Sequence, residues 1–103
     1  MTSSFYQILL ALADEARHGY AIMREIEVRT DGAEVVGAAT LYRSLAKMLE
    51  AGLIRELEGE TGDGDERRRL YEMTASGRDA LRDEAGRLQR LAGYAVRKGL
   101  FEA

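Results

Sequence analysis

Apolar residues follow helical spacing in the first third of this chain. A helix is predicted from about Ser4 to Ala13, because apolar residues recur there at i, i+3, i+4 and i+7 behind polar capping candidates. These apolar residues are Phe5, Ile8, Leu9 and Leu12. A turn at Asp14 to Arg17 leads to a second helix, predicted from Gly19 to Arg29 or Thr30 and ended by Gly32.

A third helix is predicted from Ala38 or Ala39 to Gly52, after a short extended piece at Glu34 to Val36. Its two faces differ in chemistry, because at about 100° per residue one arc is apolar and the opposite arc is small and basic. The apolar arc holds Leu41, Leu45, Met48 and Leu49, and the opposite arc holds Ala39, Thr40, Arg43, Ala46 and Lys47. A helix, a tight linker and a second, two-faced helix are typical of a helix-turn-helix.

Two short strands are predicted next, at Leu53 to Leu57 and Leu70 to Thr74, because both segments are rich in β-branched, aromatic or large apolar residues and flank a glycine-rich loop. Thr74 is then expected to cap a last helix that reaches about Leu100. The sequence therefore predicts a mainly α fold with a small β-hairpin wing. Residues 1–74 would form a winged helix-turn-helix, and residues 75–103 a C-terminal dimerisation helix.

Charge is distributed unevenly along the 103 residues, whose formal net charge is −3. The loop between the strands is acidic from Glu58 to Glu66, and the arginines Arg67 to Arg69 follow it directly. The third helix carries Arg43 and Lys47 on one face. Basic groups are therefore concentrated where a helix and a wing would meet a phosphate backbone, although the chain as a whole is acidic.

The polar face of the third helix has the residue types that read DNA in a major groove. Ala39 is small enough for a close approach, Thr40 can hydrogen-bond or touch a thymine methyl, and Arg43 can bind guanine through two hydrogen bonds. Lys47, one turn further along, is expected to meet phosphate. The alternative interpretation is an amphipathic surface helix whose polar face is simply solvated.

Two interpretations of the wing arginines are open. Arg67, Arg68 and Arg69 either bind flanking phosphates or the minor groove, or neutralise acids across the hairpin such as Glu56. Cross-strand ion pairs of this kind are common and individually weak. The acidic tip of the loop would repel DNA, so only the base of the wing is expected to contact it.

The last helix carries an apolar seam that alternates by four and three residues, as in paired helices. The seam consists of Leu81, Ala85, Leu88, Ala92 and Ala95, and Leu91, Tyr94 and Val96 widen it. A second copy of the chain is the expected partner, with Tyr6 and Leu10 on the first helix as a receiving surface. The alternative is that the seam packs back on its own domain.

Other classes of protein lack support in the sequence. There is no cysteine and only one histidine, His18, so no metal site is expected, and Ser44 and Ser76 have no recognisable base partner for nucleophilic catalysis. The chain is therefore expected not to be an enzyme and to need no cofactor. No signal peptide and no apolar run of ~20 residues is present, so a soluble, cytoplasmic protein is expected, with no membrane partner.

Four segments together resemble the PadR family of transcriptional regulators over nearly the whole chain. They are ILLALADEARHGY near the N-terminus, HGYAIMREIE from His18, TLYRSLAKMLEAGLI from Thr40, and RRLYEMTASGRDAL from Arg68. The resemblance implies a dimeric winged helix, usually a repressor, of the compact type with one C-terminal helix. It also implies that Tyr20, Thr40, Tyr42 and Arg43 lie at or near DNA, and that the last helix pairs with the partner's first helix.

The chain differs from the usual family pattern at one position of the third helix, and the resemblance also implies an effector. Proline is common after the Leu-Tyr pair in the family, whereas Arg43 stands here, so the base contacts are expected to differ. Relatives respond to small hydrophobic or phenolic effectors, which a pocket near Tyr6, Leu88, Leu91 and Tyr94 would hold. The sequence thus favours a dimeric repressor of double-stranded DNA with a pseudo-palindromic operator. The alternative is a winged-helix module that binds another protein without specific DNA binding.

Overall fold

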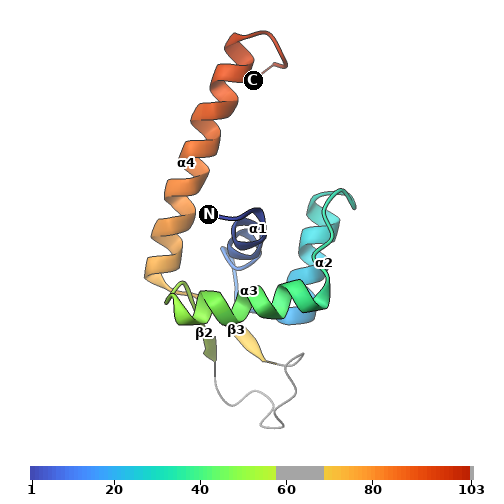
Figure 1. The fold of residues 1–103 in the computed structure, drawn as a ribbon, viewed down its shortest axis with the longest axis vertical. Helices are drawn as coiled ribbons and strands as arrows, with labels where there is room; N and C mark the ends of the chain where they lie inside the picture. Colours follow the sequence, from blue (N-terminus) through green and yellow to red (C-terminus); the bar gives the residue numbers. More distant parts are fainter. Residues whose placement is uncertain (58–68, 103) are drawn as a thin grey trace.

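The chain is mainly helical with a small antiparallel sheet (Figure 1), which confirms the predicted fold class. A computed structural model describes residues 1–57 and 69–102. The elements are α1 (Ser3–Ala11), β1 (Arg17–His18), α2 (Gly19–Arg29), α3 (Ala38–Glu50), β2 (Ile54–Leu57), β3 (Leu70–Met73) and α4 (Ala75–Arg97). In Figure 1, α3 lies across the base of the body, the hairpin lies beneath it, and α4 rises away from both.

Helix ends follow the capping residues that the sequence predicts. Thr74 Oγ1 accepts a hydrogen bond from the backbone N–H of Gly77 at 3.0 Å and so caps α4. Gly52 has a φ of +76°, the left-handed conformation that ends a helix without a side-chain penalty. α1 ends at Ala11, two residues earlier than predicted, because Arg17 Nε donates to the Ala11 carbonyl at 2.7 Å where a further helical turn would have bonded.

The sheet has the strand order β1-β3-β2, and both pairings are antiparallel. β2 and β3 are the two predicted wing strands, with Ile54 opposite Met73. Arg17 of β1 was predicted to lie in a turn, but it pairs with Tyr71 on the side of β3 that faces away from β2. Among the described residues, 34–36 form no strand, although Val36 is buried in the core.

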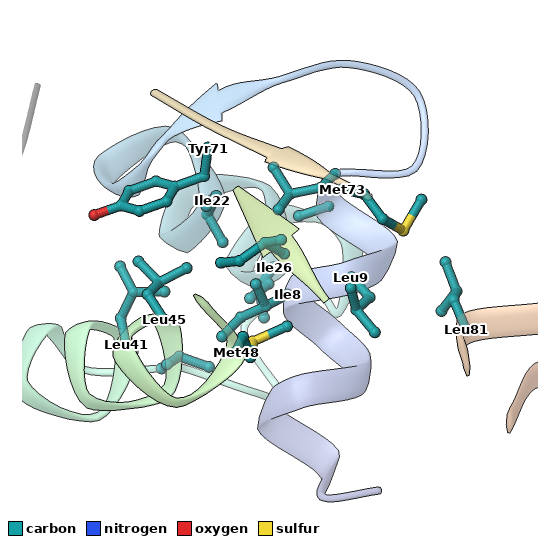
Figure 2. Packing of buried hydrophobic residues seen from close by; sticks show 14 residues of the cluster. Ile8, Leu9, Ile22, Ile26, Leu41, Leu45, Met48, Tyr71, Met73 and Leu81 are labelled. Carbon is teal, nitrogen blue, oxygen red and sulfur yellow. The ribbon is translucent and has the colours of Figure 1, made fainter. Parts of the chain in front are cut away.

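One apolar core joins the four helices with β2 and β3 (Figure 2). Three α3 side chains, Leu41, Leu45 and Met48, are 0–1% exposed and face α1 and α2. Each fully buried side chain of this size contributes about 1.5–3 kcal/mol relative to exposure in water. The remaining core residues are Ile8, Leu9, Ala11, Leu12, Ile22, Ile26, Val36, Ile54, Tyr71, Met73 and Leu81.

α4 is attached to this body mainly by its first turns. Gly77 and Leu81 are its buried residues, although the helix is 23 residues long. The molecule measures 53 × 28 × 21 Å along its principal axes, and the C-terminal end of α4 lies at one extreme of the long axis (Figure 1). Most of α4 therefore has no covering from its own chain.

Candidate nucleic-acid interface

α3 has the two faces that its sequence predicts. Ala39, Arg43, Ala46 and Lys47 are exposed on the side opposite the core, and Thr40 is half-buried at its edge. Ser44 is also buried, at 7% exposure, which the apolar periodicity does not indicate because serine is polar. The exposed face is therefore short, and it combines small alanine side chains with two positively charged ones.

The two residues predicted to read bases are in contact with each other. Arg43 Nη2 donates a hydrogen bond to Thr40 Oγ1 at 3.3 Å, within the first two turns of α3. The N-cap residue is Gly37, which has no side chain to cap the helix. The first backbone N–H groups of α3 and its dipole therefore favour an anion such as phosphate at this end.

Tyr42 lies between the two helices of the helix-turn-helix and is half-buried. A Cβ atom at Gly19 would lie 2.6 Å from the Tyr42 hydroxyl, so the tyrosine ring packs directly on the backbone at the start of α2. Tyr20, the next residue, is 63% exposed. The family-like His-Gly-Tyr motif thus has a packing reason: the glycine leaves room for Tyr42, and the tyrosine after it faces solvent.

Arginines at the base of the wing pair with glutamates across the sheet. Arg69 Nε lies 3.5 Å from Glu56 Oε1, and Arg55 Nε donates to Glu72 Oε1 at 2.7 Å. These pairs are at least one-third exposed, so each adds little to stability. Arg67 and Arg68, as well as the acidic tip from 58 to 66, lie outside the described residues.

The seam of α4 divides into a buried start and an exposed remainder. Leu81 is 7% exposed and belongs to the core of its own chain (Figure 2), so its assignment to the dimer interface is corrected. The periodicity placed Leu81 on the apolar face of the helix, but it could not show whether its own chain or a second copy covers that face. Leu88, Leu91 and Tyr94 are exposed, at 37%, 53% and 57% respectively. Of the other predicted interface residues, Ala92 is exposed, whereas Tyr6, Leu10, Ala85 and Ala95 are half-buried.

A hollow of about 200 Å³ lies where α1 meets the middle of α4. Tyr6 and Leu88 line it, together with Glu84 and Arg87, while Leu91 and Tyr94 lie outside its lining. Arg87 donates to both carboxylate oxygens of Glu84, from Nε at 2.9 Å and from Nη2 at 2.7 Å. These hydrogen bonds hold the pKa of Glu84 below its usual value.

The described part of the chain holds no cluster of three or more His, Cys, Asp or Glu side chains that would bind a metal ion. Nδ1 of His18 is buried without a hydrogen-bond partner among the described residues, at the junction of β1 and α2. Over the same residues, no helix is long and apolar enough to cross a membrane.

Proteins similar to the chain include one from Streptomyces fradiae and one from Clostridium thermocellum. An uncharacterized 37.1 kDa protein of transposon Tn4556 from Streptomyces fradiae is 41% identical over 86 residues, which are 84% of this chain and 23% of that protein. The chain therefore spans less than a quarter of that relative. A transcriptional regulator from Clostridium thermocellum is 25% identical, with a TM-score of 0.77 over 95% of this chain and 96% of its own.

A further solved structure shares the fold. The Bacillus subtilis PadR protein, solved in complex with operator DNA, is 23% identical, with a TM-score of 0.68 over 79% of this chain and 45% of its own. The family model of PadR-like transcriptional regulators matches residues 8–83, which include the helix-turn-helix, the wing and the start of α4. The chain belongs to the PadR-like family of transcriptional regulators.

Proposed function

We propose that this regulator is a homodimeric repressor that binds a pseudo-palindromic DNA operator with α3 in the major groove. The supporting observation is that α3 buries its apolar arc and exposes a small, cationic one. The Bacillus subtilis protein of similar fold was solved with operator DNA. Thr40 and Arg43 would contact base edges, with Ala39 allowing the close approach.

Phosphate contacts would fix the position of the protein on the duplex. Lys47 is suited to this role by its exposure one turn beyond Arg43. Tyr20 and the arginines Arg67 to Arg69 are proposed alongside it, with Tyr42, whose hydroxyl is buried against Gly19, positioning the start of α2. Arg69 would exchange its Glu56 partner for phosphate, because the exposed pair is weak enough to open.

The exposed stripe of α4 is proposed to bind a second copy of the chain. Residues 75–103 would act as the dimerisation helix and residues 1–74 as the DNA-binding part. Leu88, Leu91 and Ala92 lie on the uncovered length of α4, with Ala85 and Ala95 beside them and Tyr6 and Leu10 on α1 as the receiving surface. A two-fold dimer places two copies of α3 about one DNA turn apart, ~34 Å.

Regulation is proposed to enter at the hollow between α1 and α4. A small hydrophobic or phenolic compound bound beside Tyr6 and Leu88 would contact the proposed dimer surface. The compound would strengthen or weaken DNA binding only if its affinity differs between two conformations of the dimer.

The test is selection of bound fragments from genomic DNA at low salt, followed by affinity measurements on the enriched sequence at increasing salt. We expect enrichment of a pseudo-palindrome and an affinity that falls steeply with salt, because cationic side chains displace counterions. Arg43→Ala should weaken binding, and Arg90→Ala, which removes the same charge from exposed α4, should not. Absence of any enriched sequence would favour a protein-binding module instead.

A further inference from the structure

The end of α3 and the beginning of α4 are hydrogen-bonded to each other. Thr74 donates twice to the turn that closes α3, from Oγ1 to the Gly52 carbonyl at 2.6 Å and from its backbone N–H to the Leu53 carbonyl at 3.1 Å. The same Oγ1 accepts from the N–H of Gly77 in the first turn of α4. One threonine therefore caps α4 and fixes it to the last turn of α3.

Gly77 brings the two backbones closer than any side chain would allow. A Cβ atom at this position would lie 2.0 Å from the Leu53 carbonyl oxygen and 2.9 Å from its carbon. Both obstacles are backbone atoms, which cannot rotate away. Any residue larger than glycine would therefore push α4 off the end of α3.

Arg78 adds a third attachment, to α1. Its Nη2 donates to the Ala13 carbonyl at 2.9 Å, between residues 65 positions apart. Ala13 lies just beyond the C-terminal end of α1, where a cation is also favoured by the helix dipole. The base of α4 is thus held on one side by the end of α3 and on the other by the end of α1.

We propose that Thr74, Gly77 and Arg78 form an interhelix clamp that sets the spacing of operator half-sites. The inference rests on the proposed function, because it requires α3 to read DNA and α4 to bind the second copy. Given those roles, the clamp is the joint that fixes the reading helix relative to the dimer surface. The three residues of the clamp would thus act as positioning residues, which determine operator specificity without contacting DNA.

The length of α4 makes the angle at the clamp important. Leu91 is 14 residues from Gly77, which is ~21 Å along a helix at 1.5 Å per residue. A tilt of ~10° at the clamp would move Leu91 by ~3.6 Å. That displacement is about the ~3.4 Å rise of one base pair, so a loose clamp would let the dimer fit operators of more than one spacing.

The first experiment measures spacing specificity directly. The half-site enriched by the wild-type chain is placed in duplexes as two copies whose separation changes one base pair at a time. The wild type should show one sharp optimum. Arg78→Ala should lose about threefold to tenfold in affinity at that optimum, the range for loss of one ordinary hydrogen bond, and bind more tightly than wild type at neighbouring spacings. Its affinity for a single half-site should not change.

Matched variants separate the clamp from charge and from folding. Arg78→Lys should restore part of the optimum, because its ammonium can also donate to the Ala13 carbonyl. Arg82→Ala removes an arginine one turn along α4 that is 73% exposed and pairs with Asp79 of the same helix, so its profile should match wild type. Gly77→Ala is the more drastic change, and Arg78→Ala carries the test should Gly77→Ala fail to fold.

A second measurement needs no DNA. The chain has no cysteine, so Ala46→Cys on α3 and Arg90→Cys on α4 allow two spin labels, with labelled chain diluted in unlabelled chain. We expect one narrow distance distribution, and with Arg78→Ala a distribution wider by ~3 Å or more. An unchanged distribution would overturn the clamp.

The outcomes distinguish this inference from the proposed function. If the wild type selects an operator and Arg78→Ala keeps an equally sharp optimum, the clamp does not set spacing, while the repressor proposal stands. If the wild type selects no DNA, the proposed function fails and the spacing role fails with it. In that case a broadened distance distribution would still support the joint between α3 and α4.

Discussion

α3 and α4 are both two-faced helices, but their outer faces have opposite chemistry. α3 exposes Arg43 and Lys47 among alanines, a surface that water solvates well. α4 exposes Leu91 and Tyr94 over a length that its own chain does not cover. Two-sidedness alone therefore says only that one face is buried. The chemistry of the exposed face indicates whether a helix is suited to bind a charged ligand or an apolar partner.

The helices also differ in how firmly the body holds them. α3 is fixed along its length by three fully buried side chains, whereas α4 is fixed only over its first half, by Leu81, the clamp and its contact with α1. Substitutions on the inner face of α3 should therefore affect folding. Those on α4 beyond Leu88 should affect association and leave folding intact.

The largest effect is expected from the inner face of α3. Leu45→Ala removes a side chain that is 1% exposed and leaves a cavity, so the free energy of unfolding should fall by ~2–5 kcal/mol. Denaturant unfolding measures this loss. Ala46→Ser, at the next, exposed position, is the control and should change stability by less than ~0.5 kcal/mol. A similar loss in both variants would contradict the two-faced arrangement.

The next effect is expected on the outer face of α4. Leu91→Glu should weaken the dimer by ~100-fold or more, because each two-fold interface would bury two carboxylates. Sedimentation at several concentrations measures the association. Arg90→Glu changes the charge by more at a position about 100° around the helix from Leu91, away from the seam, and should leave the dimer intact. An unaltered Leu91→Glu dimer would place the interface elsewhere.

A smaller effect separates two residues of the outer face of α3. Arg43→Ala should cost ~1–3 kcal/mol of binding and relax base preference at one operator position. Lys47→Ala should weaken binding equally across sequences and reduce the salt dependence. Selection from randomised operators with each variant checks both. The assignment of base reading to Arg43 is wrong if Lys47→Ala is the variant that changes the preferred sequence.

The smallest effect is expected at Glu84, whose pKa is lowered by the hydrogen bonds from Arg87. A lowered pKa in the folded state adds stability above the pKa of the unfolded state, and this contribution is lost as pH falls through the folded pKa. Arg87→Ala should raise the Glu84 pKa towards its ordinary value, as measured by NMR titration of the carboxyl carbon. Arg87→Ala should therefore be slightly less stable than the wild type at neutral pH, and this difference in the free energy of unfolding should disappear in acid.

The sequence predicted the parts of the fold that depend on local pattern. The faces of α3 followed from 13 residues of regular periodicity, and the caps Thr74 and Gly52 from short-range conformational preferences. β1 escaped prediction because it has two residues and forms by pairing with Tyr71, more than fifty positions away. The early end of α1 likewise depends on a tertiary contact of Arg17.

The candidate site was predictable as a set of exposed residues but not as a set of contacts. Periodicity placed Leu81 and Leu88 on one seam, yet only the packing of α4 on the body shows that the first is buried and the second is exposed. The partners of Arg55 and Arg69 depend on strand register, which no local pattern specifies in a long hairpin.

The packing of Tyr42 on Gly19 has an evolutionary consequence. Because a Cβ at position 19 would lie 2.6 Å from the tyrosine hydroxyl, any side chain there forces the half-buried ring of Tyr42 to move, which couples the two positions. Among descendants of this chain, alanine or serine should become acceptable at position 19 only after position 42 has lost its hydroxyl or its ring. The path of permitted substitutions at the heart of the helix-turn-helix therefore has a required order.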